Sequence, residues 1–144
     1  KIEKEYGSFN LPVTFAKSGR YSTKEKDFYV KVGEENEWFP NNVSVNIGKN
    51  KYALDDHLKF KDAIMRQLLQ QLEGSQAQLE GSGSYTEQGY VLYTFVINDE
   101  NCTTTQYYIV GDHKYVLVHE TVEGESKETD EATLLIINSF RWKE

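Results

Sequence analysis

The hydrophobic pattern of the last third of the chain constrains its fold more than any other feature. Apolar and polar residues alternate over residues 103–110 and again over residues 114–122, which is typical of half-buried strands. The segment between them, Gly111-Asp112-His113-Lys114, predicts a hairpin turn. An acidic loop follows, and an amphipathic segment that ends at residues 136–140 predicts a helix. We therefore expect a sheet against which a C-terminal helix packs.

Three more strands are predicted in the first half of the chain. Residues 6–12 form a short edge strand in this prediction, because Pro12 has no amide hydrogen to donate to a ladder. In the other two strands every second residue is apolar, so each strand buries one face. The residues predicted to lie on these two buried faces are Phe28, Val30 and Val32, and then Val43, Val45 and Ile47.

The period of the apolar residues becomes helical between Leu54 and Leu72, which predicts the main helix, a rod about 28 Å long. Asp55 or Asp56 can cap its start, and Gly74 can end it in a left-handed conformation. The predicted buried side of this helix contains Leu54, Leu58, Ile64, Met65, Leu68, Leu69 and Leu72.

Residues 73–88 are rich in glycine, serine and glutamine and leave two interpretations open. One is an exposed polar strand that breaks near residues 81–83 and resumes at residues 84–87. The other is a disordered linker. The strand predicted next, residues 90–98, has Val91, Tyr93, Phe95 and Ile97 on one face, and residues 98–101 predict a hairpin turn into the strand that begins at Cys102.

The final helix is predicted to begin at Thr129, whose hydroxyl can cap it, with Asp130 and Glu131 in the first turn, where the helix dipole favours negative charge. Its predicted buried stripe consists of Ala132, Leu135, Ile136 and Phe140.

Length and charge narrow the classes of function. The 144 residues fit one domain, and no internal repeat divides them. The formal net charge of −7 would repel phosphate backbones, so nucleic acid is not an expected partner. Cys102 is the only cysteine, which excludes a disulfide within the chain and a zinc site built from cysteines. The longest apolar run, residues 134–137, is far shorter than the roughly 20 residues of a transmembrane helix.

Five short segments, spread over nearly the whole chain, occur in an order that points to a fold family. They are Phe9-Asn10-Leu11-Pro12, Asn42-Val43-Ser44-Val45, Leu54-Asp55-Asp56-His57-Leu58, His113-Lys114-Tyr115-Val116-Leu117 and Ile136-Ile137-Asn138-Ser139-Phe140. In their order and in their local sequence they resemble the PsbP-like superfamily, which includes an extrinsic photosystem protein and many bacterial secreted lipoproteins. All five consist mainly of packing and turn residues, so the resemblance brings no active-site residues with it.

The resemblance implies an α+β fold for residues 1–144, in which an antiparallel sheet lies between a long central helix and a C-terminal helix. By analogy with the bacterial members it also implies an extracellular or cell-surface location. The sequence begins with Lys1 rather than methionine, and we expect a further segment upstream of it; the residues leave open whether that segment is a signal or a lipid-anchor peptide.

No residue pattern predicts catalysis, a cofactor or a metal site. His119 with Glu120, or His57 with Asp56, could contribute to a metal site, but neighbouring strand residues point to opposite faces and the spacing His-x-x-x-His is absent. The acidic stretch at residues 123–131 lacks the ligand spacing of a calcium loop and is interpreted as solvated. Residues 81–86 lack the third glycine of a dinucleotide-binding loop.

Aromatic side chains remain as candidates for an interaction surface. Trp38 and Phe39 precede Pro40 in a predicted loop, where an exposed ring can anchor a partner. Tyr107 and Tyr108 are adjacent in a strand and must point to opposite faces. We therefore name Trp38, Phe39 and Tyr107 as the candidate interaction surface; the alternative is that these rings cover the edges of the core. Trp142 is expected to pack against the sheet.

The functional expectation is a non-enzymatic, exported accessory or protein-interaction domain, the soluble part of a bacterial lipoprotein whose partner is another envelope protein. The alternative is a small-molecule-binding protein that uses a cleft between the sheet and the main helix, lined by tyrosines such as Tyr90 and Tyr93. An enzyme is the third possibility, and would require acid and base groups brought together from distant parts of the chain.

Overall fold

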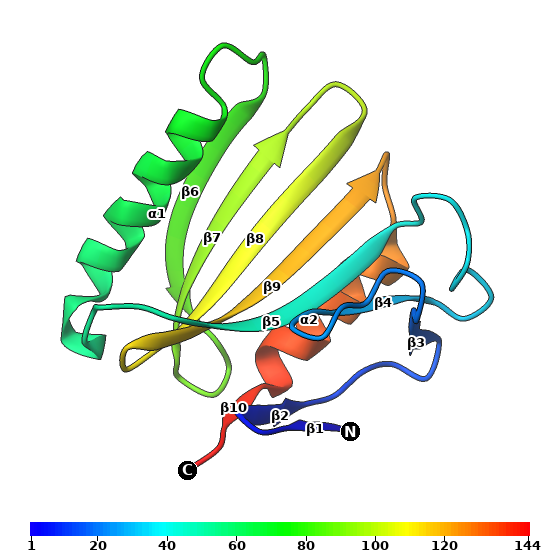
Figure 1. Ribbon diagram of the computed structural model, residues 1–144, viewed down its shortest axis with the longest axis horizontal. Helices are drawn as coiled ribbons and strands as arrows, with labels where there is room; N and C mark the ends of the chain where they lie inside the picture. Colours follow the sequence, from blue (N-terminus) through cyan, green and yellow to red (C-terminus); the bar gives the residue numbers. More distant parts are fainter.

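A seven-stranded antiparallel sheet lies at the centre of the computed structural model, which describes residues 1–144 (Figure 1). The strand order is β3-β4-β5-β9-β8-β7-β6. Its strands are β3 (Phe15–Lys17), β4 (Asp27–Lys31), β5 (Asn42–Lys49), β6 (Gln78–Tyr85), β7 (Val91–Asn98), β8 (Cys102–Gly111) and β9 (Lys114–Glu123). The helices are α1 (His57–Gln71), which follows a 3₁₀ turn (Leu54–Asp56), and α2 (Lys127–Ser139).

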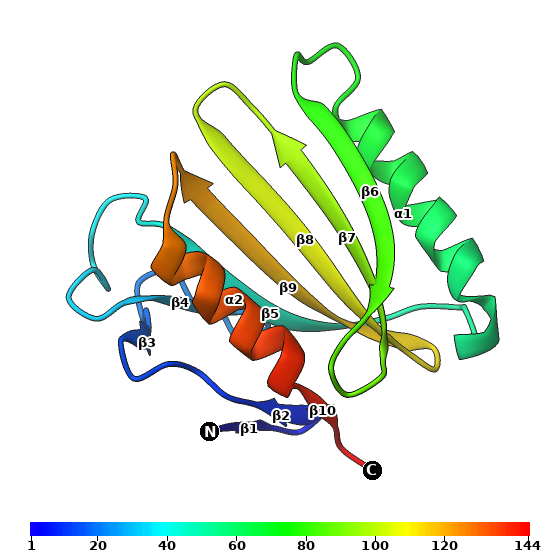
Figure 2. The ribbon, with the colours of Figure 1, turned by 180° about the vertical axis from the view of Figure 1, so that it is seen from behind.

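The two ends of the chain meet in a second sheet beside α2, and both termini lie on that side of the molecule (Figure 2). This three-stranded sheet has the order β1-β2-β10, with β1 at Ile2–Lys4, β2 at Gly7–Phe9 and β10 at Arg141–Trp142. The predicted edge strand at residues 6–12 is wrong, since β2 is the central strand here. Its neighbours are too short to show a period in the sequence, and one of them comes from the opposite end of the chain.

The hairpin of β8 and β9 has the predicted position. Gly111 pairs with Lys114, and His113 adopts a left-handed conformation with φ of 59° in the two-residue turn between them. The Asp112 carboxylate at this turn accepts a hydrogen bond from the amide of Leu54 at 3.0 Å, and so ties the hairpin to the start of the helical segment. The predicted turn from β7 to β8 is also present, with Asn98 paired to Thr103.

The helices cover opposite faces of the large sheet, as the alternation of side chains along its strands requires. On the α2 face Val43 and Val45 of β5 lie in the core, which confirms the predicted face of that strand. Side chains of α2 and of strands from both sheets fill this core, whose buried members are Phe9, Phe15, Tyr29, Val43, Val45, Leu92, Ile109, Val116, Val118, Ala132, Ile136, Ile137 and Phe140.

A smaller core lies between α1 and the other face of the sheet. Its buried members are Phe60, Leu68, Tyr93, Phe95, Tyr108 and Val110. The face predicted for residues 90–98 is confirmed, because Val91 and Ile97 pack around this core beside Tyr93 and Phe95. Tyr108 belongs to the α1 core and Tyr107 packs against the α2 core, so the two rings lie on opposite faces as predicted.

The predicted buried side of the main helix is only partly correct. Phe60 and Leu68 are the buried residues of α1, whereas Leu58 is 63% exposed and Leu69 is 55% exposed. Leu54 is exposed as well. Periodicity gives the spacing of an apolar face but not its centre, and here Phe60 packs against the rings of Tyr108 in β8 and Tyr115 in β9. Gly74 has φ of 81° just after the helix, in agreement with its predicted role.

Strand β6 runs without interruption through residues 81–83, so the predicted break is wrong and the linker interpretation is excluded. Its glycines serve packing instead. A Cβ atom on Gly81 would lie 2.8 Å from Cε of Met65 and 3.2 Å from the Phe95 ring, which is closer than ordinary contact. Glycine therefore lets α1 approach the edge of the sheet.

The predicted buried face of β4 is also wrong in part. Val32 lies beyond the end of the strand and is exposed, while Asp27 and Tyr29 are buried on the face that α2 covers. Tyr29 pairs with Val43 and enters the α2 core. Asp27 is kept in that position by two lysines, which the alternation of apolar residues cannot reveal.

The N-terminal cap of α2 is Ser126 rather than Thr129. The Ser126 hydroxyl accepts a hydrogen bond from the Thr129 amide at 3.2 Å, and the helix begins at Lys127. Thr129 and Thr133 are buried, because the start of the helix packs on the sheet. The predicted stripe holds for Ala132, Ile136 and Phe140, but Leu135 is exposed and Ile137 takes its place in the core.

The substitution Ile136→Asp tests how α2 is held. Ile136 has no exposed surface, so an aspartate there would bury an unpaired carboxylate, and we expect a loss of about 3 kcal/mol or more in the free energy of unfolding. Urea denaturation measures this loss. Leu134, 49% exposed on the same helix, supplies the control Leu134→Asp, which should change stability by less than about 1 kcal/mol. Equal stability of the two variants would contradict the packing described here.

Candidate functional site

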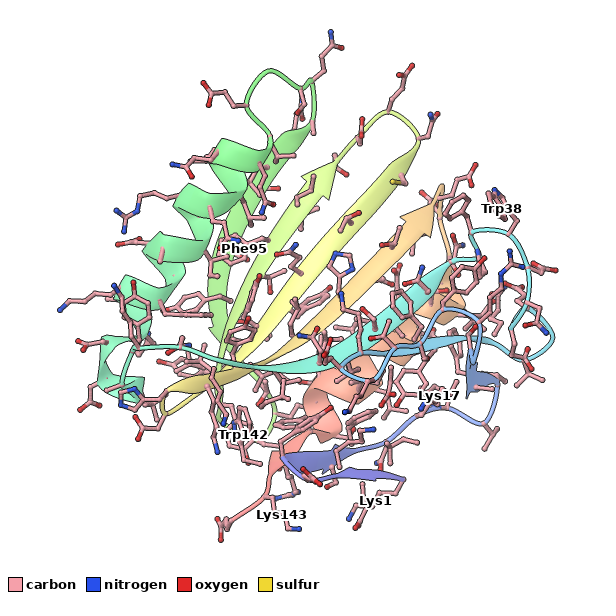
Figure 3. All side chains as sticks on the ribbon, viewed as in Figure 1. Lys1, Lys17, Trp38, Phe95, Trp142 and Lys143 are labelled. Atoms are coloured by element: carbon pink, nitrogen blue, oxygen red, sulfur yellow. The ribbon has the colours of Figure 1, made fainter.

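Two large aromatic side chains project from the loop between β4 and β5. Trp38 is 74% exposed and Phe39 is 71% exposed, and their ring centroids lie 4.6 Å apart in an edge-to-face arrangement. Figure 3 shows Trp38 at the margin of the molecule, far from Phe95 in the α1 core. We call residues 33–41 the aromatic loop. Of the three aromatic residues named as the candidate interaction surface, the two in this loop are the most exposed.

Side chains from the segment before β4 hold the aromatic loop in place. The Tyr21 hydroxyl donates to the carbonyl of Glu37 at 2.5 Å and accepts from the amide of Phe39 at 3.1 Å. The Arg20 guanidinium donates to the carbonyl of Asn36 at 2.6 Å and lies 5.6 Å from the centre of the Trp38 ring. Phe39 has φ of 51°, a left-handed conformation that non-glycine residues rarely adopt, and these contacts maintain it.

Acidic residues flank the two rings. Glu34, Glu35 and Glu37 belong to the aromatic loop, and Lys31 at its base binds Glu128 of α2 at 2.8 Å. The hydrogen bond and the negative charge of Glu128 raise the pKa of Lys31, while the same contact lowers the pKa of Glu128. The loop is thus anchored at its base to α2, and its exposed surface combines aromatic rings with negative charge.

Tyr107, the third residue of the predicted interaction surface, is placed differently. It lies on β8, half-buried against the α2 core. Burial, together with the negative charges of Glu120 and Asp130, raises the pKa of its hydroxyl to about 12. The structure therefore brings Trp38 and Phe39 together in one exposed loop and packs Tyr107 into the sheet.

A buried carboxyl group beside Tyr107 was not predicted. Glu120 of β9 is 5% exposed and lines a small concavity of about 160 Å³ together with Thr105 and Asp130. Burial, and the hydrogen bond and negative charge of Asp130, raise the pKa of Glu120 to about 8. Its Oε2 atom has no hydrogen-bond partner. The signal for it in the sequence was a glutamate that shares the inward face of β9 with Val116, Val118 and Val122.

A second buried carboxylate lies in a larger crevice between the two sheets. Asp27 binds Lys4 at 2.6 Å and Lys17 at 3.1 Å, at the side of the molecule where Figure 3 labels Lys17, Lys1 and Lys143. Burial opposes ionisation, but the hydrogen bonds and charges of the two lysines outweigh it and lower the pKa of Asp27. The crevice has a volume of about 870 Å³, and Tyr6, whose pKa is raised by burial to about 12, also lines it.

The three histidines lie in separate environments. Nδ1 of His57 is 2.6 Å from the Tyr93 hydroxyl in the α1 region, and His113 lies in the exposed turn of the β8–β9 hairpin. His119 lies on the α1 face of β9, where burial and the nearby Lys26 lower its pKa. His, Cys, Asp and Glu side chains form no group of three or more that could hold a metal ion.

The predicted ligand cleft between the sheet and α1 is wrong. Tyr93 is 4% exposed and belongs to the α1 core, whereas Tyr90 packs against Phe140 in the core on the opposite face. The two rings cannot line one cleft. Phe60 and Leu68 occupy the space between α1 and the sheet, and Phe95 has no exposed surface.

Comparison with solved structures identifies the fold. The solution structure of cyanobacterial PsbP (CyanoP) from Synechocystis sp. PCC 6803 is similar to 94% of this chain, and the similarity covers 85% of the PsbP chain with a TM-score of 0.58. The fold is PsbP-like. Sequence identity between the two PsbP-like chains is 17%, so the similarity concerns the fold alone. No protein-family model and no curated protein sequence match this chain.

The predicted α+β class, with an antiparallel sheet between two helices, is confirmed by this similarity and by the strand order. Neither helix is both long enough and apolar enough to span a lipid bilayer.

Glu120 makes stability depend on pH. Its carboxyl group has a pKa of about 8 in the folded protein and an ordinary value of 4.5 in the unfolded chain, so unfolding releases a proton between these two pH values. The contribution of Glu120 is therefore fully present below pH 4.5 and is lost as pH rises toward 8, by up to about tenfold in the unfolding equilibrium per pH unit.

The substitution Glu120→Gln removes this proton and keeps a donor for Asp130. In urea denaturation at pH 5 to 9 we expect the difference in stability between variant and parent to shift in favour of the variant as pH rises. Because His119 and Asp27 titrate in both proteins, the difference isolates Glu120. Glu131→Gln, an exposed substitution on α2, should leave the pH dependence unchanged. A difference that does not vary with pH would show that Glu120 is ionised in the fold.

Proposed function

We propose that this protein is a non-enzymatic accessory domain that binds another protein of the cell envelope through its aromatic loop. The observation that carries the proposal is the exposure of Trp38 and Phe39 on a loop that Arg20 and Tyr21 hold in one conformation. Exposed aromatic residues on soluble proteins are typical of sites that a partner covers. The PsbP-like fold is compatible with an accessory role and supplies no catalytic residues.

The geometry of the loop favours tight binding by few residues. Trp and Tyr, with Arg, are the residue types that dominate the energetics of protein interfaces, and Trp38, Tyr21 and Arg20 lie together here. Because hydrogen bonds already order the loop, less conformational entropy is lost when a partner binds. Glu34, Glu35 and Glu37 favour a partner whose pocket for the two rings has a basic rim.

The distribution of ionisable groups argues against an enzyme. The three histidines lie in separate environments, and the paired carboxyls Glu120 and Asp130 line a concavity of about 160 Å³. Pockets that bind small molecules usually have volumes of roughly 300–1,000 Å³. Glu120 and Asp130 are therefore better explained as part of the packing of α2 on the sheet.

An exported location, with a lipid anchor upstream of Lys1, completes the proposal. Its support is the resemblance of the sequence to bacterial PsbP-related lipoproteins. The residues encoded before Lys1 provide the test. An apolar stretch that ends in a cysteine, together with recovery of the full-length protein in the membrane fraction, would support the anchor, and a methionine directly before Lys1 would contradict it.

Small-molecule binding remains the second candidate, now at a different place. The crevice beside Asp27 has a volume of about 870 Å³ and combines Lys4 and Lys143 with Tyr6. A thermal-shift screen of anionic and aromatic metabolites tests it, since a ligand at about 100 times its dissociation constant stabilises the fold by ~2.7 kcal/mol. A shift that Tyr6→Ala abolishes and Trp38→Ala does not would favour this candidate over the aromatic loop.

The substitutions Trp38→Ala and Phe39→Ala test the aromatic loop. Each should weaken binding to an envelope partner by about 30-fold or more, because hot-spot residues contribute about 2 kcal/mol or more each. Binding is measured by capture of detergent-solubilised envelope proteins on the immobilised domain, followed by titration of the purified partner. Thermal melting should remain within a few degrees of the parent, since both side chains are mostly exposed.

Leu134→Ala is the matched control, because Leu134 is an exposed apolar residue on α2, outside the aromatic loop. It should leave partner binding unchanged. If the partner binds the Trp38 and Phe39 variants as tightly as the parent, the aromatic loop is not the interface.

A further inference from the structure

Strand β6 leaves a long edge of the large sheet open. It is the last strand in the order and has eight residues, whereas β3 at the other end has three. Its backbone hydrogen bonds within the chain go to β7, and no side chain of the protein bonds to the backbone of residues 78–85. The groups on the outer side are therefore available to a further strand.

The alternation of hydrogen bonds between β6 and β7 shows which backbone groups of β6 point outward. The amide of Thr86 donates to the carbonyl of Tyr90 at 2.9 Å, just beyond the paired residues Tyr85 and Val91. In an antiparallel pair the hydrogen-bonded residues alternate, so the even-numbered residues of β6 direct their backbone groups to β7. Leu79, Gly81, Gly83 and Tyr85 direct theirs away from the sheet.

The amino-acid sequence of β6 does not itself protect this edge. Residues 78–85 contain no proline and no lysine, their single charge is that of Glu80, and four of the eight residues are glycine or serine. These features favour pairing with another strand, since small side chains allow a close and flat approach. Lysine, proline and bulges are among the features by which soluble proteins prevent such pairing at an edge strand.

Helix α1 places apolar surface above this edge. Met65 contacts β6 at Gly81, and Leu58 and Leu69 lie seven residues before it and four after it, so the three share one side of the helix. Leu58 and Leu69, which we call the α1 ledge, are 63% and 55% exposed. In both Figure 1 and Figure 2 α1 runs along β6 at the outer margin of the sheet.

The α1 ledge follows the length of the strand. His57, next to Leu58, bonds to Tyr93, which pairs with Gly83 near one end of β6. Leu69 lies about three turns further along the helix, toward the other end. A strand added about 4.8 Å beyond β6 would therefore cover apolar side chains that now face solvent.

We propose that this edge binds an extended segment of a partner protein as an eighth strand, and that the segment alternates apolar and basic residues. Every second side chain of such a segment faces the α1 ledge and Tyr85, which is 70% exposed on the same face. The intervening side chains lie on the face of Glu80, Ser82 and Ser84, where a basic residue meets the Glu80 carboxylate.

The negative charge of this chain favours a basic partner segment, rather than a second copy of the chain, as the occupant of the β6 edge. Each copy has a formal net charge of −7, and pairing of two β6 strands would bring two Glu80 carboxylates to one small interface. A basic segment is attracted by the same field. The proposed edge lies across the sheet from the aromatic loop, which β4 and β5 position at the other side, so it is a site distinct from the proposed function above (Figure 3).

The test uses the heptapeptide acetyl-VKVKVKV-amide as probe, with NMR of the full ¹⁵N-labelled chain as readout. We expect saturable binding in which the amides of Leu79, Gly81, Gly83 and Tyr85 become protected from hydrogen exchange on addition of the peptide. Amides of the even-numbered residues already bond to β7 and should change little. Binding without this alternation would overturn the proposal, as would the absence of binding at millimolar peptide.

Variants separate the parts of the site. Leu69→Ser should weaken peptide binding about tenfold, because it removes most of the apolar area that one leucine offers, whereas Leu134→Ser on α2 should have no effect. Ser82→Lys places a charge of the peptide's own sign on the edge and should weaken binding, whereas Ser82→Glu should strengthen it. Equal binding by the lysine and glutamate variants would overturn the charge assignment.

Two controls distinguish other occupants and the other interface. The peptide acetyl-VEVEVEV-amide should bind at least tenfold more weakly than its lysine counterpart. Protection of the outward amides without peptide, together with a dimer in sedimentation, would show that a second copy occupies the edge and would overturn the proposal. Trp38→Ala should leave peptide binding unchanged, so failure of this proposal and failure of the aromatic-loop proposal remain distinguishable.

Discussion

The structure depends on the opposite orientation of neighbouring side chains along β7, β8 and β9. Tyr107 and Tyr108 are adjacent in the chain, yet one packs toward α2 and the other toward α1. Val116 and Val118 face α2, while Tyr115 and Leu117, which alternate with them along β9, face α1. A single layer of backbone thus carries two cores, and each helix is held by the strands rather than by the other helix.

Two buried carboxyl groups on the α2 face of the sheet differ in protonation state because their neighbours differ. Asp27 remains ionised because Lys4 and Lys17 bind it, whereas Glu120 faces a second carboxylate, Asp130, and keeps its proton up to about pH 8. The contrast follows from the partners, since burial opposes ionisation of both groups. Their effects on stability therefore have opposite signs of pH dependence, with Asp27 contributing above its lowered pKa and Glu120 contributing below its raised one.

The surfaces that we assign to binding lie at opposite sides of the same rigid sheet. The aromatic loop follows the short strands near β3, where Tyr21 and Arg20 fix it, and the open edge of β6 lies beneath the α1 ledge. A sheet with both faces covered moves little, so neither surface needs to reorganise when a partner binds. This arrangement allows one domain to join two different partners without contact between them.

Local pattern was sufficient for most of the architecture. The alternation in β5, β7, β8 and β9, the helical period after Leu54 and the hairpin at Gly111 predicted the antiparallel sheet and its two helices, because one face of each element must leave water. The position of Trp38 and Phe39 before Pro40 was compatible both with exposed rings and with rings that cover an edge of the core, and the structure shows both rings exposed.

Other features depended on contacts between distant segments. The small sheet joins both chain ends, Leu58 and Leu69 remain exposed because Phe60 fills the aromatic core instead, and β6 stays continuous because its glycines admit Met65. The buried state of Glu120 likewise requires α2 to bring Asp130 against β9. A sequence determines which residues can share a face, but only tertiary packing decides how far that face is covered, because coverage depends on the shapes of neighbours that lie far away along the chain.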